Sequence, residues 1–262
     1  MLYSGFGMKL KRLLFAELNR SDLRAAAPSA LVVIPCGAVE QHGPHLPTGT
    51  DFFTVDHIAR AAGRIAADSV PLLVAPAMPF GCSQHHIPFG GTMSMTTETY
   101  YRAMFEMVLA VVQSGFKRVF LLNGHGGNHE ILQLVARDIA LQKPAHVAAA
   151  SYWTIAWDAL IAVDAHKGMR LPGHAGIFET SMMLAQRPDL VPAERPHRDN
   201  VGDTDPRNFH KPYRAEHPGS WQTIEGYTDS PDRATSDRGQ KYMTAVIDAV
   251  AAAFVEFHGS VS

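Results

Sequence analysis

The chain has 262 residues, of which 46% are hydrophobic and 18% charged, as in one large globular domain with a sizeable core. A formal net charge of −2 provides no basic surface for nucleic acid or an anionic membrane, so we expect neither as a partner. No apolar run approaches the roughly 20 residues of a membrane helix, and the N-terminus has no signal-peptide core, so a cytoplasmic location is expected. Two cysteines, Cys36 and Cys82, suit reduced thiols.

Short apolar runs alternate with helical periodicity along the first 150 residues. After a polar, partly helical lead-in over residues 1–29, strands are predicted at 31–36, 72–75, 118–122 and 146–151, and helices at 51–67, 97–114 and 128–142. This alternation predicts an α/β fold with three layers, α/β/α, around a mostly parallel central sheet.

The remainder of the chain is less regular. Helices are predicted at 178–186 and, as an Ala-rich amphipathic segment, at 240–257, whereas residues 187–242 show little periodicity. So long an irregular stretch is typical of a functional loop, so we expect residues 193–242 to form a pocket lid or an oligomer contact. With no repeat or linker, residues 1–262 are predicted to form a single domain.

Carboxylates and imidazoles follow the first predicted strand. Glu40 and His42 stand two residues apart, so an extended backbone points both side chains the same way, and Asp51 opens the next helix. These are ligand types of a hydrolytic divalent-metal site, at a strand end where open α/β proteins place their chemistry. The alternative is that Asp51 caps the helix and His42 bonds to the backbone.

A glycine-rich turn after the third predicted strand places His125 at the same sheet edge, within Asn123-Gly-His-Gly-Gly-Asn128. A plain strand-to-helix turn and a phosphate-binding turn are the alternatives. The dinucleotide-binding pattern fails because residue 129 is histidine, and no P-loop lysine follows.

The third polar segment holds His174 and, in the first turn of a predicted helix, Glu179. Either Glu179 complements the helix dipole, or one residue is a metal ligand and the other a proton carrier. A thiol amidase built on Cys36 or Cys82 is a further alternative. Of the adjacent pair His85 and His86, at most one would join a given site.

Taken together, these motifs resemble the creatininase family (creatinine amidohydrolases and relatives). The matching segments are residues 37–43 with Asp51, 123–125, 151–153, 176–185 and 188–191. The resemblance implies the α/β/α fold, two divalent ions per chain (zinc or manganese, with iron as an alternative), and hydrolysis of a non-peptide or cyclic amide C–N bond. It also implies a small-molecule amide substrate and a homo-oligomer, such as a hexamer.

Site roles follow from the same resemblance. The implied metal ligands are Glu40, His42, Asp51 and His125, with Asp51 bridging the two ions, and Glu179 is added as a candidate ligand. His174 and Glu179 are the implied catalytic residues, and the candidate substrate-binding residues are Ser83, His86, Gly126, Trp153 and Arg170.

The chain departs from creatininase proper, which has tyrosine and glutamate at Gly126 and Gly127 and tryptophan at Arg170. The glycine version of the turn resembles relatives such as the mycofactocin-pathway peptidase and formamidopyrimidine deformylases. We therefore expect Glu179 to supply the missing carboxylate, and an inward Arg170 would favour an anionic substrate. A deformylase or peptidase acting on a formamide or modified peptide is the alternative enzyme, and a degenerate metal-binding scaffold is the alternative of another class.

Overall fold

The computed structural model describes residues 10–205 and 217–261. Within them, four parallel strands form one sheet in the order β2-β1-β3-β4. The strands are β1 (Leu31–Cys36), β2 (Leu72–Val74), β3 (Arg118–Asn123) and β4 (His146–Ser151). The residues of β1 and β3 are almost all apolar and buried. Such strands are typical of a parallel sheet that is covered on both faces. The predicted parallel sheet is confirmed.

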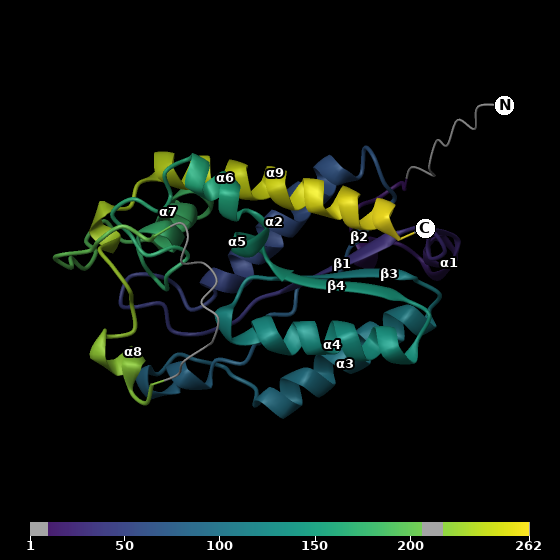
Figure 1. The fold of residues 1–262 in the computed structure, drawn as a ribbon, viewed down its shortest axis with the longest axis horizontal. Coiled ribbons are helices and arrows are strands. Elements are labelled where there is room, and N and C mark those ends of the chain that lie inside the picture. The colour runs from purple at the N-terminus through teal and green to yellow at the C-terminus, as the bar shows by residue number, and fades with distance from the viewer. Residues whose placement is uncertain (1–9, 206–216, 262) are drawn as a thin grey trace.

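Helices cover both faces of this sheet (Figure 1). On one face lie α2 (Thr50–Ala66), α5 (Tyr152–Ile155), α6 (Trp157–Ala162), α7 (Ile177–Gln186) and α9 (Ser236–Ser260), and on the other α1 (Arg20–Ala26), α3 (Thr97–Gln113) and α4 (His129–Gln142). Side chains alternate along each strand, so Val33 packs into the α2 and α9 core while Val32 packs into the α3 and α4 core. The three-layer prediction is confirmed.

The winding of the chain reverses at the centre of the sheet. From β1 the chain passes through α2 to β2, and then returns across β1 through α3 to reach β3. The connections on either side of the β1–β3 pair therefore lie on opposite faces, which leaves a crevice at the carboxyl ends of these two strands. The glutamate, histidine and aspartate motifs follow these ends.

Most predicted elements match the structure to within a residue or two. The last helix begins at Ser236, four residues before the predicted start, because Thr235 caps it by accepting from the Arg238 N–H. The irregular stretch 187–242 also holds the short elements η4 (Pro188–Leu190), α8 (Ser220–Thr223) and η6 (Pro231–Arg233). Single-turn elements such as these and α5 carry no readable periodicity. The parts of the lead-in and loop predictions that fall on residues 1–9 and 206–216 lie outside the described residues.

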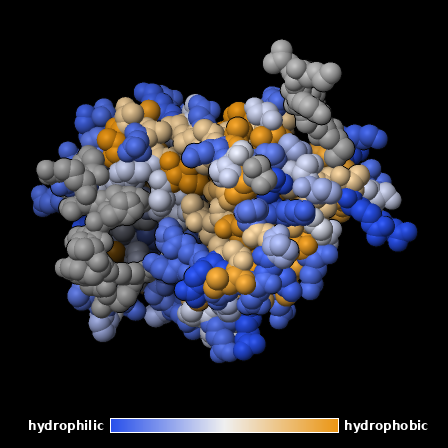
Figure 2. All heavy atoms as spheres, turned by 45° about the vertical axis from the view of Figure 1, so that its right-hand side comes forward, coloured by the Kyte–Doolittle hydropathy of each residue, from blue (hydrophilic) through white to orange (hydrophobic). Residues whose placement is uncertain are grey.

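Figure 2 shows one face of the molecule, on which hydrophobic side chains gather across the middle between polar ones. Within residues 10–205 and 217–261, no helix has both the length and the apolar character needed to cross a membrane.

Candidate metal centre

The segment between β1 and α2 brings Glu40, His42 and Asp51 together. Its first residue, Gly37, lies against the α2 backbone, where an added Cβ would come within 2.6 Å of the Phe52 Cα. The cap position of α2 is Gly49, and the Asp51 carboxylate in the first turn faces two imidazoles instead of capping the helix. The capping alternative for Asp51 is therefore wrong.

The Asp51 carboxylate lies between two histidines. Its Oδ1 is 3.1 Å from His42 Nε2, and its Oδ2 is 3.1 Å from His125 Nδ1. Each histidine has a second carboxylate beside it: Glu179 Oε2 lies 3.8 Å from His42 Nε2, and Glu40 Oε1 lies 3.3 Å from His125 Nδ1. Two sets of nitrogen and oxygen donors thus share one aspartate.

Both oxygens of Glu40 and Oδ2 of Asp51 are buried and accept no well-aligned hydrogen bond, although His125 Nδ1 lies beside two of them. A buried carboxylate left in this way is costly unless a cation or proton neutralises it. The donor atoms of His42, Asp51 and Glu179 lie within 4.8 Å of one another, as do those of Glu40, His85 and His125, and those of Glu40, His42 and His174. These side chains fit divalent ions such as zinc or manganese.

In both His42 and His125, the ring nitrogen that points away from the carboxylates forms hydrogen bonds that orient the ring. His42 Nδ1 lies 3.1 Å from the Glu40 carbonyl oxygen, and a proton on Nδ1 leaves Nε2 free to act as a ligand. His125 Nε2 lies 3.1 Å from the Cys82 carbonyl and 3.1 Å from Ser83 Oγ, which leaves Nδ1 facing the carboxylates. Ser83, a candidate substrate contact, is thus placed where it holds His125.

The charges of the cluster are strongly coupled. Although burial opposes its charged form, the carboxylates of Asp51, Glu179 and Glu40 raise the pKa of His42 to about 10. Burial raises the pKa of Glu179 to about 8, despite the nearby His42. Perturbed acid and base groups of this kind are typical of a functional site.

The loop before α7 carries His174 and is held by a segment more than 50 residues later in the chain. The buried Asp229 carboxylate accepts hydrogen bonds from the main-chain N–H groups of Arg170 (2.8 Å) and Ile177 (2.6 Å). Thr228 Oγ1 accepts from the His174 N–H at 3.0 Å. The sequence patterns indicated neither Asp229 nor Thr228, because only the tertiary fold brings them to this loop.

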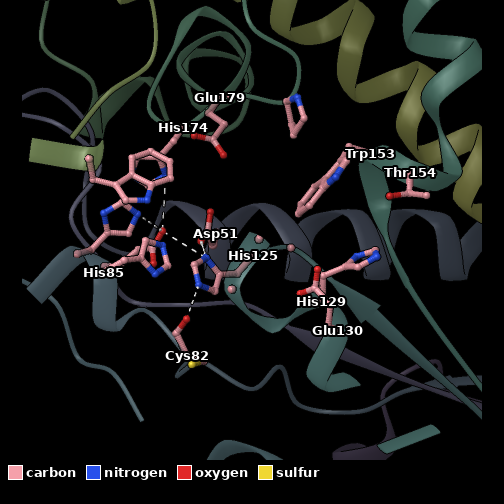
Figure 3. Close-up of a pocket in the computed structure, with 18 residues that line it drawn as sticks. Asp51, Cys82, His85, His125, His129, Glu130, Trp153, Thr154, His174 and Glu179 are labelled. Carbon is pink, nitrogen blue, oxygen red and sulfur yellow. Dashed lines mark hydrogen bonds and ion pairs between the residues drawn. The ribbon is translucent and has the colours of Figure 1, made fainter. Parts of the chain in front are cut away.

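A cavity of about 610 Å³ opens onto the cluster. Figure 3 shows Asp51, His125, His174 and Glu179 on one side, and Trp153, Thr154, His129 and Glu130 on the other. The main chain of Gly126 and Gly127 lines the wall as well. The cavity therefore extends well beyond the candidate metal ligands.

The two glycines of this wall are not equivalent. A Cβ on Gly126 would meet nothing within 4 Å, whereas one on Gly127 would lie 2.1 Å from the Cys82 carbonyl oxygen and 2.6 Å from His125 Nε2. This backbone therefore accepts no glutamate at position 127. The carboxylate of Glu179 lies at the cluster, 3.8 Å from His42 Nε2, and its role as the replacement ligand stays a prediction.

The other predicted contacts divide into two groups. His86 and Trp153 line the cavity, with His85 beside them, whereas the side chain of Arg170 is exposed and lies off the cavity wall. The main chain of Arg170 serves the loop instead, through Asp229. An inward Arg170 is therefore not observed.

Trp221 of α8 also lines the cavity, with ring centroids 4.8 Å from His86 and 5.2 Å from His174. No sequence pattern singled it out, since α8 has only four residues.

Burial raises the pKa of Cys36 to about 12, so this thiol is a poor nucleophile at neutral pH.

With this geometry in place, comparisons with known proteins assign the class. The family model described as "Creatininase: Creatinine amidohydrolase" matches residues 16–254. The chain is 30% identical over 238 residues to a "Mycofactocin precursor peptide peptidase" of Mycobacterium tuberculosis, covering 87% of this chain and 85% of the relative. It is 27% identical over 253 residues to a "Creatinine amidohydrolase" of Pseudomonas putida, covering 90% and 92%.

Solved structures agree with these relatives. A structure titled "Creatininase Mn" superposes with a TM-score of 0.70 at 26% identity, covering 94% of this chain and 98% of that one. Another creatininase structure, described as Zn-Zn type, has a TM-score of 0.70 at 25% identity over the same shares of the two chains. The chain thus shares its α/β fold with creatininases. The chain belongs to the creatininase family of amidohydrolases.

Proposed function

We propose that the protein is a metal-dependent amidohydrolase that cleaves a non-peptide or cyclic amide C–N bond of a small molecule. One observation carries the proposal: the two oxygens of Asp51 face different histidines, and each histidine has its own second carboxylate. This arrangement suits two ions that share a bridging aspartate. Its ligands would be His42, Asp51 and Glu179 for one ion and Glu40, Asp51 and His125 for the other, with zinc, manganese or iron as the metal.

Divalent ions held there would polarise the amide carbonyl and lower the pKa of a water molecule to about 7. The chain itself supplies the proton transfers. His174 Nδ1 faces the cavity, 3.6 Å from Glu40 Oε1, and takes a proton from the attacking water. The hydroxyl part of that water joins the carbonyl carbon, and His174 returns the proton to the leaving nitrogen as the C–N bond breaks.

A second candidate activity is cleavage of a peptide or a formamide by the same residues. It is supported by the extension of the cavity past Gly126 towards Trp153 and Glu130, which gives room for a substrate longer than a compact ring. The 30% identity to a mycofactocin precursor peptide peptidase points the same way. The two candidates differ in substrate and not in chemistry.

The test begins with metal content per chain of the purified protein. A hydrolysis screen follows with creatinine, small lactams, formamides and short peptides, each with and without EDTA. We expect about two divalent ions per chain and turnover that EDTA abolishes, zinc or manganese restores, and iodoacetamide leaves intact. Binding of metal without turnover would support the scaffold alternative, and EDTA-resistant, iodoacetamide-sensitive turnover would support the thiol alternative.

We also propose a homo-oligomer, which light scattering on the purified protein would test.

A further inference from the structure

Gln41, between the candidate ligands Glu40 and His42, has a buried side-chain amide whose orientation is fixed by main-chain groups. Its Oε1 accepts the Gly43 N–H at 2.9 Å, and its Nε2 donates to the Gly226 carbonyl at 3.0 Å. The N–H group can only donate and the carbonyl can only accept, so the two bonds independently give the same assignment of oxygen and nitrogen.

This assignment determines where His86 carries its proton. Gln41 Nε2 lies 2.9 Å from His86 Nδ1, and because the amide nitrogen is a donor, Nδ1 must accept. The neutral His86 ring then has its proton on Nε2. That N–H faces the cavity, 3.5 Å from Glu40 Oε1.

The main-chain carbonyl of Gln41 gives His174 the opposite role at the cavity, that of a proton acceptor. His174 Nε2 lies 2.9 Å from the Gln41 carbonyl oxygen and 3.1 Å from Gln41 Nε2. The two hydrogens of the Gln41 amide are taken by the Gly226 carbonyl and by His86 Nδ1, so His174 Nε2 donates to the Gln41 carbonyl and its Nδ1 is left unprotonated. Nδ1 lies 3.6 Å from Glu40 Oε1. The His86 and His174 rings are stacked, with centroids 4.2 Å apart and planes 17° apart, so they offer a donor and an acceptor side by side at the same carboxylate.

We propose that Gln41 is a positioning residue that makes His86 a hydrogen-bond donor to the substrate carbonyl oxygen and leaves His174 Nδ1 as the proton acceptor. This inference rests on the proposed function. As water adds to the carbonyl carbon, the His86 Nε2–H stabilises the charge that develops on the carbonyl oxygen and keeps its proton. The proton of the water moves to His174 Nδ1 and then to the leaving nitrogen.

Most backbone N–H groups of the glycine-rich turn, residues 124–128, are not available for this donor role. Three of its N–H groups already donate elsewhere: Gly124 to the Cys36 carbonyl, His125 to Asn123 Oδ1, and Asn128 to the His125 carbonyl. The His86 Nε2–H, in contrast, is directed at the cavity on a buried ring that the Gln41 amide holds in place.

The direct test is the tautomer of the two histidines, read by NMR of histidine-labelled protein in the metal-free and zinc-loaded forms. We expect both rings to carry the proton on Nε2 in the wild type. In Gln41→Glu, an oxygen acceptor replaces the amide nitrogen beside His86, so its proton should move to Nδ1. A wild-type His86 with its proton on Nδ1, or a Gln41→Glu variant with an unchanged tautomer, overturns the inference.

Kinetics provide the second arm. Gln41→Met should lower kcat by about tenfold to 100-fold while metal content and KM stay close to wild type. The exposed Gln142→Met is the matched control and should leave kcat unchanged. His86→Phe should lower kcat by about 100-fold, and His86→Gln, which keeps an N–H near the Nε2 position, should recover part of that loss.

A wild-type kcat in Gln41→Met or in His86→Phe would overturn the donor role. Thermal melting of each variant separates these effects from misfolding. If the wild type hydrolyses none of the amides, the proposed function fails, whereas the NMR measurement still decides how Gln41 sets the tautomers.

Discussion

The imidazole of His42 meets the carboxylate of Asp51 at 3.1 Å between Nε2 and Oδ1, and the other Asp51 oxygen is left to face His125. One carboxylate therefore connects two histidines that come from different strand ends. Because both Asp51 oxygens are engaged in this way, this side chain has no substitute within the cluster.

Asp51→Asn should consequently lose both metal and activity. The amide keeps the shape but presents an NH₂ group to one histidine, so it cannot bridge two cations. We expect metal affinity and kcat/KM to fall more than about 100-fold, beyond the range for residues that only support a ligand. Metal analysis after dialysis and turnover on the best substrate check this. Exposed Asp248→Asn is the control, and full activity in Asp51→Asn would contradict the bridging role.

Metal binding should release protons and strengthen as pH rises. The pKa of His42 is raised to about 10 and that of Glu179 to about 8, so both groups hold protons at pH 7 in metal-free protein. An ion needs them deprotonated, so it competes with protons, and its affinity should increase from pH 6 towards pH 8. Titration calorimetry of zinc in two buffers of different ionisation enthalpy measures the release. An affinity independent of pH would refute this prediction.

The two glycines beside His125 should respond differently to the same change. Gly127→Ala places a methyl group against the Cys82 carbonyl and the His125 ring, so it should destabilise the fold by about 1–3 kcal/mol and weaken metal binding. Gly126→Ala adds a methyl group in open space and should leave the melting temperature unchanged or slightly raised. Thermal melting and metal content of the pair decide. Equal behaviour would mean that the turn relaxes freely.

Asp229→Asn should loosen the loop that carries His174. The variant keeps one acceptor for two main-chain N–H groups, at a cost of about 1–3 kcal/mol. Glu40, His42, Asp51 and His125 do not depend on this loop, so much of the metal binding should survive while kcat falls. Measuring unfolding, zinc content and kcat on one preparation separates the two effects. Loss of all metal together with kcat would show that the loop also holds the ions.

The sequence was most informative where local pattern and chemistry coincide. The continuous apolar runs at 31–36 and 118–122 predicted the two central strands, and the residues just after them predicted that Glu40, His42 and His125 would meet at one edge. Most helix boundaries followed from periodicity. The parallel sheet is confirmed, whereas the ligand roles stay a prediction.

The rest of the site depends on contacts that no local pattern records. Trp221 lies in a four-residue helix, and Asp229 acts through hydrogen bonds to residues more than 50 positions away. The side-chain direction of Arg170 could not be inferred either, since a loop residue between Gly168 and Pro172 has no periodicity, and the structure leaves this arginine exposed. Gln41 stood within the recognised motif, but its role emerges only when the partners of its amide are known.

The hydrogen bonds that join the 170–177 loop to Thr228 and Asp229 also bear on how the site forms as the chain is synthesised. Glu40, His42, Asp51 and His125 depend on β1, α2 and β3, which have all been made once residue 125 has left the ribosome. The His174 loop has to wait for residues 226–230, roughly 50 residues later. Four of the five candidate cation ligands are therefore synthesised well before the segment that holds the proton-transfer loop, and the fifth, Glu179, follows that loop directly in the sequence.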